Sequence, residues 1–330
     1  MKNQDESHLI FSELLNCYSP YNSDFGELFV KHLSHFESIK IEKQYIYSLQ
    51  DAKSKNLLTN SDKQKTLIKE GHWTDKEETK INDTIKFITS MRETISKEFL
   101  LSKRRLLRRE VADAEKRLNA ILMKKDFLMG LTAEKYARQQ SIHNQIVNSF
   151  YKNESLTEKF SEDDMQDEDI YNKLIEIYNR HNDRININMI KNIAVSSFFT
   201  NLFYMCGDNA YYFYGKPIVQ LTNYQTDLFS YGRYFKNLMG QYGDKLPKEM
   251  SDNPDDMIEF FEISKNVEDS GILKEDENGN GGSSSVMGAT REDLKMMGVD
   301  SSQIRTVADD MKKLGKSHLT KEDIMGLRGG

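Results

Sequence analysis

The apolar residues of the central part of the chain recur at spacings of three and four positions, which predicts helices. Two such stripes lie between residues 75 and 129, one before and one after Ser102. The first stripe consists of Ile81, Ile85, Ile88, Ile95 and Phe99, and the second of Leu107, Val111, Ala114, Leu118, Ile121 and Leu128. Stripes that persist over about three to four heptads are typical of coiled-coil-like pairing. We therefore expect two long helices here.

The ends of these two helices carry local signals. Thr74 and Glu77 form a capping-box pattern that starts the first helix, and Gly130 follows the second helix. Ser102 is expected to be the N-cap of the second helix, which favours an antiparallel hairpin folding back near residues 100–104. The alternative is one continuous rod that pairs with another chain, which would make the protein an oligomer.

The flanking regions predict further helices. Residues 1–30 indicate a short helix followed by a loop, and the apolar spacing from Leu28 to Leu58 indicates an amphipathic helix. Thr132 is expected to cap a helix from Ala133 to Tyr151. The acidic run at residues 161–169 leads into another helix, because acids in a first turn complement the helix dipole.

Residues 189–240 are crowded with phenylalanine and tyrosine. The pattern predicts a helix, a turn at Gly207, a short aromatic segment, and a second helix from Thr222 to Met239. Such a density of aromatic side chains indicates a compact core packed against neighbouring helices.

The C-terminal region changes to linker composition and then contains an internal repeat. Residues 263–289 include a polar, glycine- and serine-rich stretch that is typical of flexible linkers. Beyond it, the segment Thr290-Arg-Glu-Asp-Leu is echoed by Thr320-Lys-Glu-Asp-Ile. Each copy predicts a short capped helical turn that either docks on the rest of the protein or binds a partner.

These patterns define an all-α fold with a long antiparallel helical hairpin, a compact aromatic-rich helical module and a flexible C-terminal tail. The expected divisions are an N-terminal helical region (1–71), the hairpin (72–131), the aromatic-rich domain (132–262), the linker (263–289) and the tail (290–330).

Composition narrows the function classes. The net charge of −6 argues against wholesale nucleic-acid binding, and the two cysteines, Cys17 and Cys206, lack the spacing of a zinc site. The N-terminus lacks the apolar stretch of a signal peptide, and no apolar run is long enough for a membrane span. We therefore expect a cytoplasmic protein that does not enter a membrane.

Candidate chemistry is sparse. Residues 276–281 match the first half of an EF-hand loop, but Met287 occupies the position that needs a glutamate. His32 and His35 are expected to be a surface pair on one helix face without a third metal ligand. If an enzyme is hidden in the aromatic module, its polar candidates are Asp208, Tyr211, Lys216 and Asp227. We predict no catalytic, cofactor-binding or metal-binding residue.

Two groups of residues are candidates for binding a partner. The first is a basic cluster expected at the hairpin tip, which could grip carboxylates or phosphates; it consists of Lys103, Arg104, Arg105, Arg108 and Arg109. The second is the tail repeat, with Thr290, Glu292, Asp293, Leu294 and Met297 in one copy and Thr320, Glu322, Asp323, Ile324 and Met325 in the other. The basic tip keeps nucleic-acid association open as the alternative to protein binding.

The hairpin at residues 75–129, the segment Phe213-Tyr-Gly-Lys-Pro217 with the following residues 221–228, and the linker-borne tail together resemble tailed-bacteriophage proteins. The resemblance is to tail-assembly chaperones and minor structural proteins. It implies a non-enzymatic protein that binds another tail component, such as the tape-measure protein, in the host cytoplasm or the virion.

Overall fold

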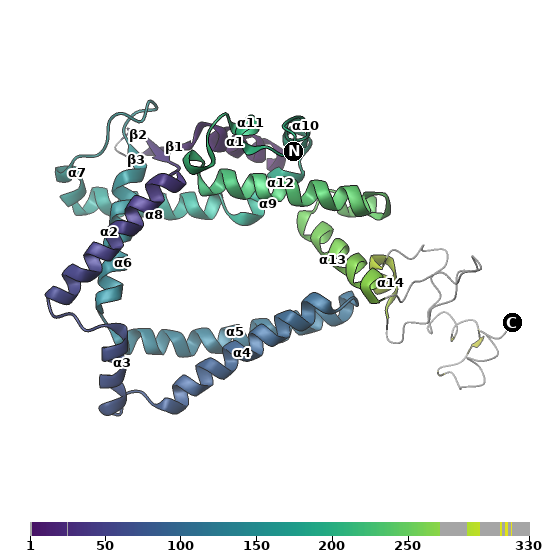
Figure 1. The fold of residues 1–330 in the computed structure, drawn as a ribbon, viewed down its shortest axis with the longest axis horizontal. Helices are drawn as coiled ribbons and strands as arrows, with labels where there is room; N and C mark the ends of the chain where they lie inside the picture. Colours follow the sequence, from purple (N-terminus) through teal and green to yellow (C-terminus); the bar gives the residue numbers. More distant parts are fainter. Residues whose placement is uncertain are drawn as a thin grey trace. The chain divides into compact units, whose positions relative to one another are not determined.

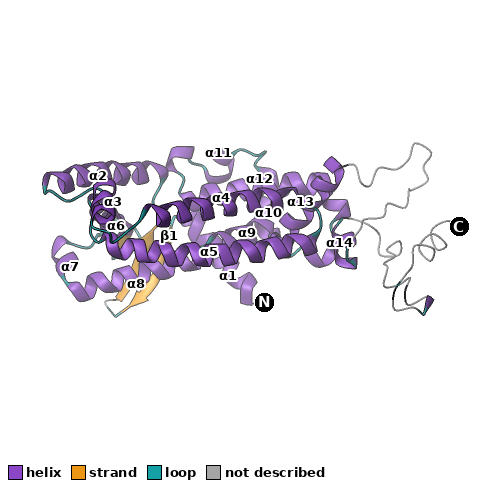
Figure 2. Cartoon of the chain, turned by 90° about the horizontal axis from the view of Figure 1, so that it is seen from below, coloured by secondary structure: helices purple, strands orange, loops and turns teal. Residues whose placement is uncertain are grey.

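The structure is a computed structural model that describes residues 2–24, 26–270 and 289–297, with positions 311, 314, 315 and 318. Helices dominate the described chain, which confirms the all-α fold class, and one small sheet is added to them (Figures 1 and 2). The chain forms two compact units. The first comprises Met1–Glu77, Met123–Gln241 and Asp252–Pro254, and the second Glu78–Leu122, Tyr242–Ser251 and Asp255–Gly330.

The first unit begins with α1 (Lys2–Asn16) and a three-stranded antiparallel sheet. The sheet has the order β1 (Tyr18–Ser23), β2 (Gly26–Lys31) and β3 (Phe150–Tyr151). The prediction of a loop followed by a helix from Leu28 was wrong here. Leu28, Phe29 and Val30 are all buried along β2, and Leu28 and Val30, two positions apart, enter the same core from a strand, whose period is two.

Helices pack on this sheet and complete a hydrophobic core. α2 (His35–Ser54) starts at a capping box formed by Ser34 and Glu37, and it packs along α6 (Ala133–Ser149). Thr132 caps α6 as predicted, because its side chain accepts a hydrogen bond from the N–H of Lys135. Three further helices belong to this part of the chain: α3 (Asn60–Lys69), α7 (Glu162–Gln166) and α8 (Glu168–Arg184). The buried core residues here are Leu28, Val30, Ile146, Phe150, Phe160, Leu174 and Ile177.

The aromatic module of the first unit consists of four further helices. These are α9 (Ile187–Val195), α10 (Ser197–Met205), α11 (Ala210–Tyr214) and α12 (Asn223–Tyr242). Phe199 and Phe203 stack at a centroid distance of 5.3 Å, and Phe213 and Phe229 pack around them. The expected aromatic core therefore forms.

The second unit contains most of the predicted hairpin. α4 (Asp75–Lys97) and α5 (Leu101–Met129) fold back on each other within one chain. Ile88, Ile95, Val111 and Ala114 form their shared apolar core, and Arg92 forms an ion pair with Glu115 at 2.6 Å. The predicted limits hold, since Thr74 and Glu77 exchange capping hydrogen bonds and Gly130 adopts a positive φ of 59°.

Two C-terminal helices complete the second unit. α13 (Pro254–Ser270) extends into the segment that was expected to be linker, so the first residues of that segment are helical. α14 (Arg291–Met296) is the first copy of the tail repeat, and it starts at a capping box of Thr290 and Asp293. The EF-hand-like stretch and the second copy of the repeat lie outside the described residues.

Candidate interaction site at the hairpin tip

The tip of the hairpin is the turn between α4 and α5, where both helices leave backbone groups without a partner in their own helix. The Glu98 carboxylate accepts hydrogen bonds from the N–H groups of Phe99 and Leu100, both at 3.1 Å. The first bond of α5 runs from the Arg104 N–H to the Leu100 carbonyl at 2.9 Å. Ser102 is therefore inside the first turn, and its prediction as the N-cap was wrong.

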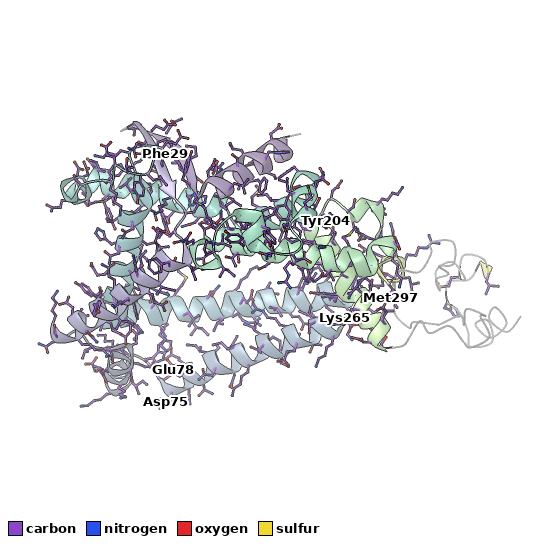
Figure 3. All side chains as sticks on the ribbon, turned by 45° about the horizontal axis from the view of Figure 1, so that its top comes forward. Phe29, Asp75, Glu78, Tyr204, Lys265 and Met297 are labelled. Atoms are coloured by element: carbon purple, nitrogen blue, oxygen red, sulfur yellow. The ribbon has the colours of Figure 1, made fainter. Side chains whose placement is uncertain are left out.

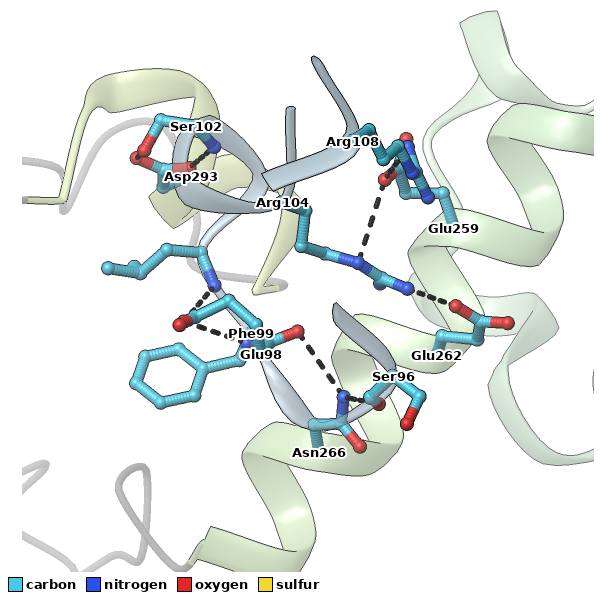
Figure 4. Close-up of polar contacts among 11 residues, drawn as sticks. Ser96, Glu98, Phe99, Ser102, Arg104, Arg108, Glu259, Glu262, Asn266 and Asp293 are labelled. Atoms are coloured by element: carbon cyan, nitrogen blue, oxygen red, sulfur yellow. Dashed lines mark hydrogen bonds and ion pairs between the residues drawn. The ribbon is translucent and has the colours of Figure 1, made fainter. Parts of the chain in front are cut away.

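Two side chains from distant segments cap this turn (Figure 4). Asn266 of α13 donates from its side-chain amide to the carbonyl of Ser96 at 2.7 Å and to that of Glu98 at 3.3 Å, which caps the end of α4. The Asp293 carboxylate accepts from the Ser102 N–H at 2.7 Å and from the Ser102 hydroxyl at 2.8 Å, which caps the start of α5.

Asp293 serves two helices at once. Its carboxylate also accepts from the N–H and hydroxyl of Thr290, at 2.7 and 2.8 Å, and thereby closes the capping box of α14. Burial alone would raise the pKa of Asp293, but the hydrogen bonds from Ser102 and Thr290 lower it below its usual value. The side chain therefore stays ionised, and its charge lies at the positive end of α5.

Ion pairs join the basic cluster to α13 and α14. Arg104 is only 1% exposed and pairs with Glu262, while its Nε lies 3.8 Å from Glu259. Arg108 lies 2.6 Å from the same Glu259 carboxylate. Arg105 forms a two-bond fork with Glu292, both bonds at 2.7 Å. Such bidentate pairs add geometric specificity to the attraction between charges.

The two predicted groups of partner-binding residues thus meet each other. In the basic cluster, Lys103 pairs with Glu98 at 2.6 Å and Arg109 is exposed, with no ion pair among the described residues. In the first tail copy, Thr290, Glu292 and Asp293 make the contacts above, Leu294 is half-buried and Met297 is buried (Figure 3). The five residues predicted from the second copy (Thr320, Glu322, Asp323, Ile324 and Met325) lie outside the described part of the chain.

A second polar cluster, in the first unit, was missed from the sequence. Arg184 forms two hydrogen bonds to Glu13, at 2.9 and 2.5 Å, and Ser19 donates to the same carboxylate at 2.5 Å. His32 Nε2 lies 2.9 Å from the Ser19 oxygen, and because the Ser19 hydroxyl donates its own proton to Glu13, the His32 nitrogen is the donor. The expectation of a surface pair with His35 was wrong, because His32 follows β2 and is 3% exposed.

Burial controls the protonation of this cluster. Desolvation lowers the pKa of His181 to about 4, with a further contribution from Arg184, and Tyr21 lies 3.2 Å from its Nδ1. Burial also lowers the pKa of His32 well below its usual value, with smaller contributions from His181 and Arg184. The rings of these two histidines lie at a centroid distance of 5.1 Å and are tilted by 35°. The cluster joins α1, the sheet and α8, and its buried members are Glu13, Ser19, His32 and His181.

The four polar candidates for an enzyme in the aromatic module have separate partners. Asp208 pairs with Lys236 at 2.8 Å, Lys216 donates to the Cys17 sulfur at 3.3 Å, and Tyr211 is exposed. Desolvation raises the pKa of Asp227, and the nearby His35 opposes this shift. The described residues therefore do not bring these four side chains together.

A different surface of the aromatic module is strongly apolar. Met205 is 85% exposed and Tyr212 is 76% exposed, and three more large side chains on the same two helices are at least half exposed. These five exposed residues, Leu202, Tyr204, Met205, Tyr211 and Tyr212, are called the α10–α11 surface below, and Tyr204 is labelled in Figure 3. Large exposed apolar side chains that gather on one surface mark interaction sites.

Comparisons with known proteins found no matching family, no matching curated protein and no matching solved structure. Among the described residues, no helix is long and apolar enough to cross a membrane. In the same residues, no group of three or more histidine, cysteine, aspartate or glutamate side chains has the arrangement of a metal site.

Proposed function

We propose that this protein is a non-enzymatic structural or assembly protein that binds another protein through the α10–α11 surface. The observation that carries the proposal is the exposure of Leu202, Tyr204, Met205, Tyr211 and Tyr212 on two consecutive helices. Tyrosine and methionine are enriched in protein interfaces, where their large side chains fill pockets of a partner.

The opposite sides of the same helices support the proposal. Phe199 and Phe203 on α10 are buried against Phe213 of α11 and Phe229 of α12. This aromatic core fixes the backbone that carries the exposed side chains. A surface presented on a packed core loses little conformational freedom on binding, which favours affinity.

The ion pairs at the hairpin tip favour a protein partner over a nucleic acid. Binding of phosphates by a basic cluster requires cations that are accessible to the nucleic-acid backbone. Four of the five tip cations instead face carboxylates of Glu98, Glu259, Glu262 and Glu292. A phosphate would have to displace these intramolecular partners.

The resemblance to tail-assembly proteins suggests the class of partner. We propose a long helical component, such as a tape-measure protein, whose apolar stripe would lie on the α10–α11 surface. Helix-in-groove recognition reads side chains at spacings of three and four positions, and such a stripe is what a long helix offers.

A photo-crosslinking experiment tests the proposal. Benzoylphenylalanine in place of Tyr212 is expected to crosslink one protein reproducibly in the native lysate, and mass spectrometry identifies it. Binding of that protein in purified form is then measured for M205E/Y212E. We expect at least about a tenfold loss of affinity, because two exposed anchors become charged.

Tyr47→Glu provides the matched control, since Tyr47 is an exposed aromatic residue on α2 in the same unit. This variant should keep the wild-type affinity, and both variants should keep the wild-type melting temperature. Equal affinity of M205E/Y212E and the wild type would refute a role for this surface.

A further inference from the structure

The tail contains the same five-residue pattern twice: threonine, a basic residue, glutamate, aspartate and an aliphatic residue. The copies are residues 290–294 and 320–324. In the first copy, three polar residues have a defined task. Thr290 caps its own helix, Glu292 forms the fork with Arg105, and Asp293 caps both α14 and α5. All three residue types recur at the same spacing in the second copy, as Thr320, Glu322 and Asp323.

The receptor side of this contact depends on few groups. The N–H and hydroxyl of Ser102 hold one carboxylate at the start of a helix of 29 residues, where negative charge is favourable. The Arg105 guanidinium, one turn further on, holds the second carboxylate. A segment needs only adjacent glutamate and aspartate residues, in a capped turn, to make these contacts.

We infer that the hairpin tip is a docking site for segments of this pattern, and that residues 320–324 of the same chain are its second occupant. This inference is independent of the proposed α10–α11 surface. The occupant is argued from the repeated contact residues and from charge complementarity, since Arg105 and the positive start of α5 hold the adjacent carboxylates of the first copy and the second copy carries the same pair.

The second copy is the weaker occupant. Beyond the shared pattern, the buried Met296 and Met297 of the first copy correspond to Gly326 and Leu327 in the second, so one large apolar side chain is lost. The second copy also begins 50 rather than 20 positions after Ser270, and the entropic cost of closing a loop grows with its length. The first copy therefore holds the tip at rest, and the second takes it when the first is withdrawn.

Peptide binding tests the recognition. The receptor is the full chain with E292A, D293A, E322A and D323A, which removes both internal ligands and is first compared with the wild type by circular dichroism. A fluorescent peptide of residues 317–328 should bind saturably, and a peptide of residues 288–299 should bind more tightly. The substitution Asp323→Ala in the peptide should weaken binding at least about tenfold, because it removes the helix-start carboxylate.

A matched pair of receptor variants separates docking from general charge attraction. Arg105→Ala should weaken the peptide, whereas Arg109→Ala should not, since Arg109 is an exposed neighbour without a role in the contact. Absence of saturable binding, or equal loss in both variants, would overturn the inference.

A crosslinking experiment identifies the segment that occupies the tip. It does not use the quadruple variant of the peptide-binding experiment. Benzoylphenylalanine replaces the exposed Leu106, the neighbour of Arg105. We expect crosslinks to residues 289–297 in the otherwise wild-type chain, and to residues 318–327 of the same chain in E292A/D293A. A mixture of ¹⁴N- and ¹⁵N-labelled chains reports the origin of the segment. Crosslinks between differently labelled chains, or no crosslink to the second copy, would overturn the assignment.

Discussion

The Asp293 carboxylate accepts hydrogen bonds from both the backbone N–H and the hydroxyl of Ser102, although the two residues are 191 positions apart. The bond fixes α14 to the start of α5 and gives that helix a cap from another segment. A residue that caps two helices should have a larger effect on stability than an ordinary surface carboxylate.

Asp293→Ala is expected to release α14 from the tip. The variant loses the cap of α5 and the Asp293 half of the capping box of α14, whose N-cap Thr290 remains, so we expect a cost of about 1–2 kcal/mol of local stability. Hydrogen–deuterium exchange should accelerate at residues 289–297 and in the first turn of α5. Glu292→Ala removes only an exposed ion pair and should cost about 1 kcal/mol or less. Equal exchange in the two variants would contradict the double-cap interpretation.

Arg104→Ala is expected to destabilise the second unit more than any other change in the basic cluster. The substitution removes a buried side chain and the partner of Glu262, whose carboxylate is partly exposed, while Glu259 keeps its ion pair with Arg108, so we expect a loss of about 1–3 kcal/mol. Urea unfolding measures this loss. Arg109→Ala, at an exposed position, should remain within about 0.5 kcal/mol of the wild type. A neutral result for Arg104→Ala would show that the pair contributes little.

Gly232 and Gly240 on α12 should respond to alanine in opposite directions. A Cβ at Gly232 would lie 2.9 Å from two ring atoms of Phe199, so overpacking should destabilise the aromatic core by about 1–3 kcal/mol. A Cβ at Gly240 meets nothing within 4 Å, and Gly240→Ala should stabilise the helix by about 0.5–1 kcal/mol. Thermal unfolding of both variants checks the sign of each change.

The buried histidines predict a loss of stability in mild acid. The pKa of His181 is lowered to about 4 in the folded chain, whereas an unfolded histidine titrates near its usual value of about 6.5. The unfolded state therefore binds more protons between these pH values. The contribution of His181 to the free energy of unfolding is fully present above about pH 6.5 and is lost as the pH decreases towards 4. The loss attributable to His181 is about 3 kcal/mol.

Urea titrations at pH 7.5, 6 and 5 test this dependence. His181→Gln should reduce the slope between pH 6.5 and 5, because it removes one of the two buried titrating groups and leaves His32. His72→Gln, at an exposed histidine, should keep the wild-type slope. If the wild type is equally stable at pH 7.5 and 5, the two histidines cannot be buried in neutral form.

Local signals made the helical part of the fold predictable. The capping hydrogen bonds of Thr74 and Thr132 involve residues within three positions, so the sequence pattern contains the whole interaction. The β-hairpin was missed because Leu28 and Val30 are compatible with both a strand and the start of a helical stripe. Only their pairing with β1 and β3 decides between the two.

The residues of the tip could be predicted from the sequence, but the contacts between them could not. The basic cluster and the tail repeat were both named from the sequence, yet their contacts join residues 187 and 191 positions apart. Sequence also gave no signal that Arg104 is buried while Arg109 is exposed, because burial depends on where α13 packs. The histidine cluster was missed for the same reason, since Tyr21 and His181 are 160 positions apart.

The hairpin turn is capped by two side chains from later segments of the chain, and this sets an order of events during synthesis. The hairpin itself is local and can pair as soon as residues 75–129 have left the ribosome. The turn remains uncapped until Asn266 and Asp293 are synthesised, 170 and 191 residues after their partners Ser96 and Ser102. At about 5–20 residues per second, that interval is about 10–40 s. During it, water must satisfy the backbone groups of the turn, and a chaperone or a second nascent chain could reach them there.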